Sequence, residues 1–337
     1  SDGSGLTEES MVRIRIRDEH GPGALDLAFA AATGPNGPVN IITPLADNGF
    51  LIGGGFTRVD DREIPHVARY DASGKLDEDF SLSMLEETDP LEFSDGVHAL
   101  LILPNEDILV GGDFHADGDV PRSNLICVTR EGHRSDQFNL GPGADGVVFA
   151  LGLQGRKAIV GGVFKHVNGT QVISLARLNP DGSLDTTFSS GLPWEAGFSN
   201  GRIQDLVVLP DDKILIGGNF TQIHGRPANR IARLHPDGDL DTAFANVGLD
   251  HDVMRLVVQS DGKIVAGGRF GFRGDLEFKG IVRLHATGPV DYSFRTGLNG
   301  EVNCLQILPD GGILLGGEFT EVQGVARQRV ALLDSDG

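Results

Sequence analysis

The sequence predicts an all-β protein built from six copies of one four-stranded sheet, and three regularities in its 337 residues lead to this prediction. The pattern Gly-Gly-x-Phe occurs six times, a β-branched residue stands 17 positions before each of these phenylalanines, and a glycine stands 18 positions after each. The six phenylalanines are Phe56, Phe114, Phe164, Phe220, Phe270 and Phe319. Self-similarity at a period of about 42 residues is typical of repeat architectures, in which each copy packs its core against its neighbours.

The fourth copy shows how a repeat divides into strands. We expect strands at 203–209, 213–220, around 230–234 and at 239–244, because apolar runs alternate there with Pro-Asp and Asp-Gly turn signals. Four antiparallel strands in each of six copies predict a six-bladed β-propeller. The predicted blade cores are 39–80, 97–138, 147–188, 203–244, 253–294 and 302–337.

The sixth copy ends at Gly337, six residues before its final phenylalanine would occur. Residues 24–29 read Ala-Leu-Asp-Leu-Ala-Phe, which matches the missing part, since 183–188 read Ser-Leu-Asp-Thr-Thr-Phe. We therefore expect 24–29 to pair as the outer strand of the last sheet and to close the ring, which removes exposed sheet edges. The predicted propeller then spans 24–337, and residues 1–23 form an N-terminal extension.

The repeated glycines and aspartates are expected to be structural. Paired glycines in a strand favour a bulge or a close backbone approach. The aspartate of the fourth strand is expected to accept local backbone hydrogen bonds. It recurs as Asp26, Asp77, Asp185, Asp241 and Asp291, and the second copy has Ser135 instead. Cys127 and Cys304 fall in predicted strands of distant copies, so we expect small core residues rather than a disulfide.

Two strings in the fourth copy resemble a known family. Residues 209–221 read Leu-Pro-Asp-Asp-Lys-Ile-Leu-Ile-Gly-Gly-Asn-Phe-Thr, and 230–244 read Arg-Ile-Ala-Arg-Leu-His-Pro-Asp-Gly-Asp-Leu-Asp-Thr-Ala-Phe. They resemble the bacterial delta-60 repeat propellers over residues 24–337, with the second and fifth copies diverging most. The resemblance implies a module of a large secreted or surface protein, with an extracellular or cell-surface location.

Residues 11–18, Met-Val-Arg-Ile-Arg-Ile-Arg-Asp, resemble the last strand of a Calx-beta module. Alternating arginine and aliphatic residues are typical of a half-buried strand. The alternative is that residues 11–18 are a further copy of the third strand of the repeat. The extension 1–23 is therefore expected to be the end of a preceding Calx-beta-like module, and the propeller a monomeric domain within a larger chain.

The net charge of −20 argues against nucleic acid, because phosphate binding needs a basic surface, and against anionic membranes. No apolar run approaches the roughly 20 residues of a spanning helix, so we expect no membrane insertion.

The first strand of each repeat is expected to line the central channel and to offer mixed polar groups at its mouth. The polar candidates there are Asn40, His98, Gln204, Asp205, Arg255 and Asn303. Asp205 and Arg255 occupy equivalent positions in adjacent copies, so we expect an ion pair. A water-lined channel without a ligand is the alternative.

The two longest links between repeats, 81–96 and 189–202, are the other candidate sites. Trp194, Glu195 and Phe198 suit sugar stacking or a cationic group, or alternatively form a plug on the blades. The acidic residues of the first link could bind Ca²⁺, although their spacing matches no calcium loop. They are Glu86, Glu87, Asp89, Glu92 and Asp95. No other cofactor is expected.

The sequence contains no Gly-x-Ser-x-Gly, His-Glu-x-x-His or Walker motif. We therefore expect a non-enzymatic binding or adhesion module that recognises a protein or polysaccharide through its loop face. One alternative is a polysaccharide hydrolase or lyase that uses Asp205, Glu86 or Glu195 as acids. The other is a rigid spacer with no ligand, since fold alone cannot choose among these functions.

Overall fold

The computed structural model describes residues 34–80, 82, 85–86, 96–116, 122–188, 201–223, 225–245, 247–273, 276–277 and 279–337. The chain divides after Gly143 into two compact units, which are described separately below. The described residues form strands and turns and contain no helix, which confirms the all-β class. Accordingly, no helix among them could cross a membrane.

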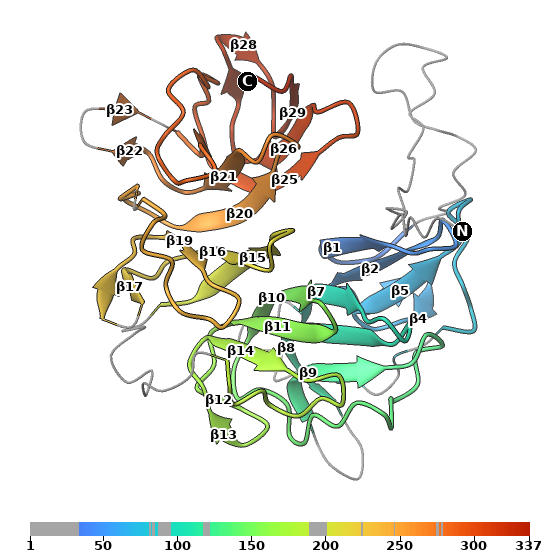
Figure 1. Ribbon diagram of the computed structural model, residues 1–337. Helices are drawn as coiled ribbons and strands as arrows, with labels where there is room; N and C mark the ends of the chain where they lie inside the picture. The colour runs from blue at the N-terminus through green and yellow to red at the C-terminus, as the bar shows by residue number, and fades with distance from the viewer. Residues whose placement is uncertain are drawn as a thin grey trace, which may run out of the picture. The chain divides into compact units, whose positions relative to one another are not determined.

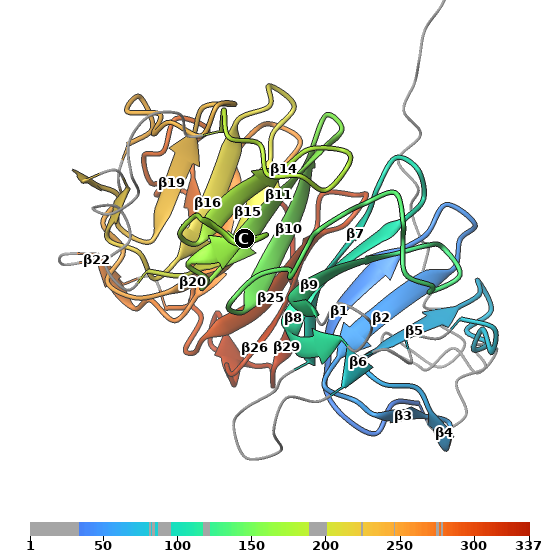
Figure 2. The ribbon, with the colours of Figure 1, turned by 90° about the horizontal axis from the view of Figure 1, so that it is seen from below.

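The described residues of the first unit form two antiparallel sheets of three or more strands (Figure 2). One has the order β1-β2-β5, formed by Val39–Pro44, Phe50–Gly54 and Val67–Tyr70. The other centres on β8 (Ile108–Ala116), which pairs with β7 (Gly96–Ile102), β9 (Arg122–Val128) and the short β6 (Leu85–Glu86). These sheets correspond to the first and second repeats.

The second unit contains four three-stranded sheets with one order, in which the second strand lies between the first and the third (Figure 1). The first strands are β10 (Val148–Gln154), β15 (Ile203–Val208), β20 (Val253–Val258) and β25 (Val302–Ile307). The second strands are β11 (Lys157–Gly162), β16 (Ile214–Gly218), β21 (Ile264–Gly268) and β26 (Ile313–Gly317). The third strands are β14 (Leu175–Leu178), β19 (Ile231–Leu234), β24 (Ile281–Leu284) and β29 (Val330–Leu333). Within this unit, neighbouring sheets pack through their first strands.

The segment between the second and third strands forms a small hairpin in five of the repeats, where the sequence predicted a polar loop. These hairpins are β3–β4 (Arg58–Val59, Arg62–Glu63), β12–β13 (His166–Val167, Thr170–Gln171), β17–β18 (Gln222–Ile223, Arg226–Pro227), β22–β23 (Phe272–Arg273, Leu276–Glu277) and β27–β28 (Glu321–Val322, Val325–Ala326). Asn168 and Gly169, with φ of 53° and 72°, form the turn of one of them. Asn-Gly is the residue pair that such a turn favours.

The predicted fourth strand does not form a full strand in the described residues, and the prediction of four-stranded blades is not confirmed. In the fourth repeat, the segment meets the third strand through a single bridge, Leu234 to Leu240. The carbonyl oxygen of Asp241, the next residue, accepts the amide of Phe244 at 3.1 Å. That bond turns the chain and ends the pairing. Residues 24–29 and 1–23 lie outside the described residues, so ring closure and the N-terminal extension stay predictions.

The glycines that recur in every repeat are required for two physical reasons. The glycines 18 residues after the repeat phenylalanines all have positive φ, from 81° to 106°, as the predicted turns require. The second glycine of each Gly-Gly pair lies against a backbone carbonyl, because a Cβ added at Gly218 would lie 2.0 Å from the oxygen of Arg202. The first glycine faces the following repeat, since a Cβ at Gly217 would lie 2.7 Å from Val253. A register shift between Ile203 and Asp205 accompanies this contact, which confirms the predicted bulge and close approach.

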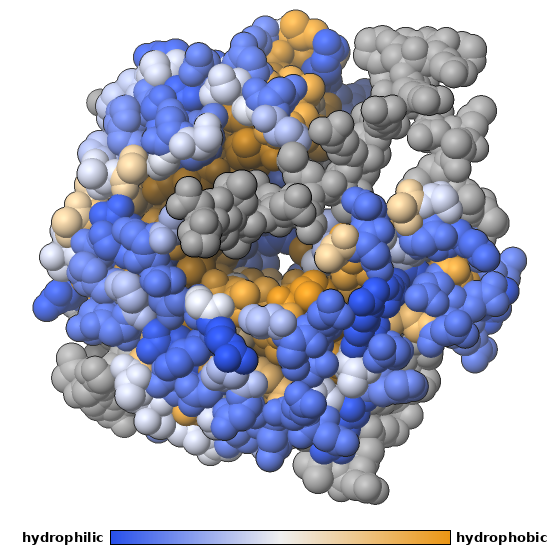
Figure 3. Space-filling model, turned by 45° about the vertical axis from the view of Figure 1, so that its right-hand side comes forward, coloured by the Kyte–Doolittle hydropathy of each residue, from blue (hydrophilic) through white to orange (hydrophobic). Residues whose placement is uncertain are grey.

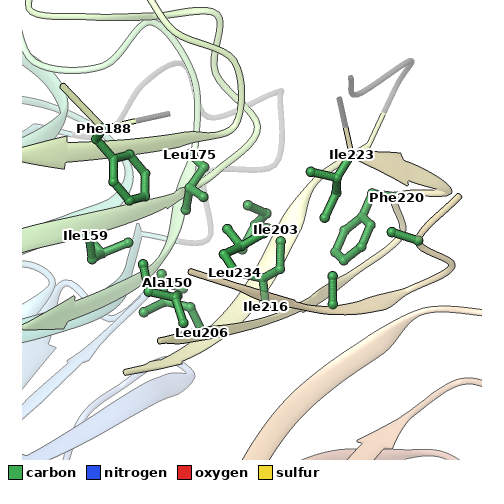
Figure 4. Packing of buried hydrophobic residues seen from close by; sticks show 13 residues of the cluster. Ala150, Ile159, Leu175, Phe188, Ile203, Leu206, Ile216, Phe220, Ile223 and Leu234 are labelled. Atoms are coloured by element: carbon green, nitrogen blue, oxygen red, sulfur yellow. The ribbon is translucent and has the colours of Figure 1, made fainter. Parts of the chain in front are cut away.

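The repeat phenylalanines belong to the hydrophobic core, and each is at most 3% exposed. Figure 4 shows one cluster, in which Phe220 and Ile223 pack beside Ile203 and Ile216. Cys127 is buried as expected, but the prediction for Cys304 was wrong, because its side chain on β25 is exposed. Neither cysteine forms a disulfide. Hydrophilic residues cover much of the surface visible in Figure 3.

Candidate functional site

The recurrent aspartates form a repeated ionic network that belongs to the framework. In the third repeat, one oxygen of Asp185 accepts the backbone amide of Thr187 at 3.0 Å. The other oxygen lies 2.7 Å from both Lys157 Nζ and Arg177 Nε. Burial acts to raise the pKa of Asp185, but the bonds from Lys157 and Thr187 outweigh it and hold the pKa well below its usual value.

Asp241 and Asp291 repeat this arrangement. Asp241 Oδ2 lies 2.8 Å from Arg233 Nε, and Asp291 Oδ2 lies 2.9 Å from Arg283 Nε. Burial opposes ionisation of Asp291, yet bonds from Ser293 and the charge of Arg283 lower its pKa to about 2. The recurrent aspartates among the described residues, Asp77, Asp185, Asp241 and Asp291, each accept a backbone amide two residues later, as predicted for a structural role.

The first strands carry the polar residues that differ from repeat to repeat. We call Asn40, His98, Gln204, Asp205, Arg255 and Asn303 the first-strand row. Each of its side chains is half-buried. In the first unit, Asn40 Nδ2 donates to the carbonyl oxygen of Val97 at 3.2 Å and lies 3.4 Å from His98 Nδ1. The structure therefore brings equivalent residues of the first two repeats together.

In the second unit, Asp205 and Arg255 form no salt bridge, so the prediction of an ion pair was wrong. The bulge of β15 turns the carboxylate toward backbone amides, so that Asp205 accepts Leu206 N at 2.9 Å and Leu256 N at 2.7 Å. Arg255 Nη1 instead donates to the carbonyl oxygen of Met254 at 3.0 Å. Asp205 thus connects β15 of one repeat to β20 of the next.

Asp205 also has an unusual acidity. Burial raises the pKa of its carboxyl to about 6, and the charge of Arg255 and the two amide bonds only partly oppose this shift. A carboxyl that titrates near neutral pH can exchange a proton or accept a hydrogen bond in either state. Such perturbed groups occur at functional sites, although structural networks also produce them.

The predicted loop-face site falls outside the described residues. Trp194, Glu195, Phe198, Glu87, Asp89, Glu92 and Asp95 all lie there. Of the predicted acidic set, Glu86 belongs to β6, where its backbone pairs with that of His115. Among the described residues, no group of three histidine, cysteine or acidic side chains could hold a metal. Binding of Ca²⁺ by residues 81–96 stays a prediction.

The first unit contains a cavity of about 300 Å³ that the sequence did not indicate. Buried Leu51 and Ile108 line it together with Asp47, Arg69 and Arg130. Asp47 Oδ2 accepts from Arg69 at 2.7 Å and from Arg130 at 3.2 Å. The cavity is lined by residues of both the first and the second repeat. A local sequence pattern could not have predicted it, because it depends on how two repeats pack.

One family model matches the chain, described as "Domain of unknown function (DUF5122) beta-propeller". The matched residues are 46–80, 157–188, 209–244, 259–294 and 308–337, which together make up half of the chain. Five of the six repeats are included, and the second is not. No curated protein matches the chain.

Solved structures similar to this chain share its fold at low sequence identity. The extracellular domain of a proposed one-component system from B. thetaiotaomicron has a TM-score of 0.50 and 13% identity. That match covers 86% of this chain, which spans about a third (33%) of the length of its relative. A streptogramin B lyase has a TM-score of 0.51 and 15% identity, over 91% of this chain and 85% of the enzyme. The GH74 xyloglucanase from Xanthomonas campestris has a TM-score of 0.55 and 13% identity, over 91% and 45%.

Proposed function

We propose, from the premise that the chain belongs to the DUF5122 β-propeller family, that it is a non-enzymatic binding module of a larger extracellular bacterial protein. Its ligand is a protein or a polysaccharide. The similar solved structures support the fold alone, because they include an extracellular domain, a lyase and a xyloglucanase. The choice of function therefore rests on the residues of this chain.

One observation carries the proposal: the repeated polar residues are occupied by the framework, while the first-strand row varies and stays partly exposed. The six repeats allow equivalent positions to be compared within one chain. Asp185 and its equivalents have the same partners in three repeats, which is what a packing requirement produces. The position of the row that Asn40 occupies instead changes from amide to imidazole to aliphatic, as Asn40, His98 and Val148 show. The exposed parts of these side chains can contact a ligand even where other atoms bond the backbone.

The polar groups of the row suit hydroxyl and amide ligands. Gln204 and Asn303 supply both donors and acceptors, and Asp205 and Arg255 add one charge of each sign. Sugars and peptide backbones present the matching groups. The loop-face residues Trp194, Glu195 and Phe198 are proposed to extend the same ligand site by stacking.

Binding is tested by titrating the purified chain with polysaccharides and extracellular proteins in a calorimeter. The double variant Gln204→Ala/Asn303→Ala should lower the affinity for the ligand by about tenfold or more, as loss of well-placed interface contacts does. Asp261→Ala is the matched control, because this exposed turn residue pairs only with Lys263 within its own repeat. Equal affinities of the double variant and the control would contradict the proposed site. If the parent chain bound none of the ligands, the result would favour the alternative of a rigid spacer.

A second candidate function is favoured by the raised pKa of Asp205. A polysaccharide hydrolase uses a general acid whose pKa is raised toward neutral pH, and burial raises the pKa of Asp205 to about 6. Release of sugar fragments by the parent chain, abolished in Asp205→Asn with the fold intact, would establish the enzyme. Intact polysaccharides after prolonged incubation would exclude it for the substrates used.

A further inference from the structure

The cavity of the first unit has an apolar floor and a charged mouth. Leu51 and Ile108 are 0% and 2% exposed and form the buried part of its lining. The other large aliphatic residues of the lining are Leu45 and Ile102. Asp47 and Arg130 are more open to solvent, because their side chains are 41% and 47% exposed. A cavity of about 300 Å³ that leads from solvent to an apolar floor is at the lower end of the range for small-molecule sites.

A glutamine side chain occupies the equivalent place between the third and fourth repeats. Ala46 and Gln154 both stand ten positions before the phenylalanine of their repeat. Gln154 is 7% exposed, and its Nε2 donates to the carbonyl oxygens of Asp212 at 2.6 Å and Pro236 at 3.2 Å. The equivalent positions of the second repeat are Glu106 and Arg130, which line the cavity. The first junction therefore has a cavity where Ala46 provides only a methyl group.

The junction between the fifth and sixth repeats also contains a glutamine. Gln259 stands 11 positions before its repeat phenylalanine, where the first repeat has Leu45. Its Nε2 donates to the carbonyl oxygen of Ser335 at 2.9 Å, and Ser335 is again equivalent to Arg130. Since neither Ala46 nor Leu45 can make such a bond, the first junction lacks both of the side chains that bridge the other two.

One arginine of the lining differs from its equivalents in what lies over its guanidinium. The position is 13 residues after the repeat phenylalanine, and each arginine there donates through Nη1 to a turn carbonyl of the next repeat. These arginines are Arg69, Arg177, Arg233 and Arg283. A phenyl ring of the same repeat lies over the last three, with 4.6, 5.1 and 4.7 Å to the ring centroid. Within the described parts of the chain no ring contacts Arg69 in this way, and Arg69 lines the cavity instead.

The charges of the lining compensate one another. Asp47 Oδ2 accepts from Arg69 at 2.7 Å and from Arg130 at 3.2 Å, and Arg130 also pairs with Glu106 at 3.0 Å. Burial acts to raise the pKa of Asp47, but the bonds from the amide of Gly49 and from Arg69 outweigh it and hold the pKa below its usual value. Two carboxylates and two guanidiniums leave no net charge that would favour an ion. Their oxygens can still accept a hydrogen bond from a neutral polar group.

We propose that this cavity binds a small neutral aromatic molecule with one hydroxyl or N–H group, of the phenol or indole class. The ring packs on Leu51 and Ile108 and takes the place over Arg69 that a phenyl ring has in three other repeats, which is favourable for a ring and a cation. Its polar group donates to Asp47 or Glu106. An apolar cavity of about 150 Å³ holds benzene, so about 300 Å³ is large enough. The site shares no residue with the first-strand row and is a function beyond the one proposed above.

The test is an NMR titration of the isotope-labelled full chain with phenol, cyclohexanol and benzoate. Phenol should bind at millimolar concentration and shift the amide signals of Leu51 and Ile108. Cyclohexanol has the same ring size and hydroxyl but no aromatic face, so it should bind about fivefold more weakly or worse. Benzoate should also bind more weakly than phenol, because its carboxylate would meet Asp47 and Glu106.

A filled cavity provides the decisive variant. Ala46→Gln should lower the affinity for phenol by about tenfold or more, because the new side chain takes the place that Gln154 has at its own junction. Ala72→Gln is the matched control, since Ala72 is an exposed alanine of the same repeat that does not line the cavity. Ala46 is exposed as well, so both variants should fold, which heat unfolding verifies.

Three results would overturn the proposal: absence of phenol binding at millimolar concentration, equal affinities of the parent chain and Ala46→Gln for phenol, or equal affinities of the parent chain for phenol and cyclohexanol. The variant Gln204→Ala/Asn303→Ala should keep the parent affinity for phenol, because both residues lie in the second unit. The outcome for this cavity is therefore independent of the outcome for the first-strand row.

Discussion

Asp205 gives the sharpest test of the electrostatics, because protonation of one carboxyl should change the stability of the second unit between pH 4 and 6. Its pKa in the folded chain is about 6, above the ordinary aspartate value of 3.8. A raised acid pKa means that the folded state binds the proton more tightly than the unfolded state. Stability from this group is therefore highest below about pH 4 and falls as the pH rises through 6.

The size of the effect follows from the shift. Each pKa unit corresponds to about 1.4 kcal/mol, so the shift of Asp205 amounts to about 3 kcal/mol, and partial exposure of the side chain reduces it to about 2 kcal/mol. The assay is the free energy of unfolding in urea for the parent chain and for Asp205→Asn, at several pH values from 4 to 8. The other titratable groups contribute equally to the free energy of unfolding of both proteins, so their contributions cancel in the difference. A difference that stays constant across this range, or one that favours the parent chain more at high pH, would refute the assignment.

Three further predictions concern the framework. Asp291→Ala should lower the free energy of unfolding of the second unit by about 3 kcal/mol, because it leaves buried Arg283 without its carboxylate; urea denaturation measures this. Gly218→Ala should destabilise the fourth repeat strongly, since the added Cβ would lie 2.0 Å from a backbone carbonyl oxygen just before β15; circular dichroism during heating shows the loss. Removing residues 1–29 should lower the melting temperature more than removing 1–23, because only the longer deletion removes the predicted closing strand.

Each of these predictions has a matched control in the chain. Asp77 pairs with Arg69 at 3.6 Å and is 34% exposed, so Asp77→Ala should cost at most about 1 kcal/mol. An added Cβ at Gly225 would meet no atom within 4 Å, so Gly225→Ala should cost only the strain of its φ of 73°. Costs as large as those of Asp291→Ala and Gly218→Ala would contradict the reasoning. Equal melting temperatures of the two truncated chains would argue against the closing strand.

Much of the framework could be predicted from the sequence because the repeat reveals positions with fixed geometry. Gly217 and Gly218 recur since the bulge and the following repeat leave no room for a side chain. The turn glycines recur since their φ is positive. The repeated copies thus supply a comparison that a single sequence normally lacks.

What the sequence missed depends on contacts between equivalent positions of neighbouring repeats. Arg233 reaches a carbonyl 53 residues away, and its side chain gives no local signal of that bond. Asp205 was predicted to pair with Arg255, but the bulge directs its carboxylate to amides instead. The exposure of Cys304 on β25 was also missed, because the apolar character of a cysteine does not show which face of its strand is covered.

The small hairpins were missed although one of them has a clear signal. Asn168 and Gly169 lie between short extended segments and form the tight turn that an Asn-Gly pair favours. The surrounding residues are polar, so alternation of apolar and polar residues gave no indication of strands. Short strands outside the core are defined by their turns and not by burial.

The second repeat shows how the framework network can change as a set. In the third repeat Lys157 and Asp185 pair at 2.7 Å, and in the second repeat the equivalent positions hold Asp107 and Ser135. Ser135 Oγ donates to Asp107 Oδ2 at 2.6 Å, so the contact is retained with the acid on the opposite strand. Because Cys127 replaces the arginine, a carboxylate at the usual position would have lost its main cation. The exchange keeps a hydrogen bond between the second strand and the segment that was predicted to be the fourth strand. It is accompanied by loss of the arginine that, in other repeats, binds the next repeat. This is also the repeat that the family model does not match, which is consistent with substitution of several framework positions together.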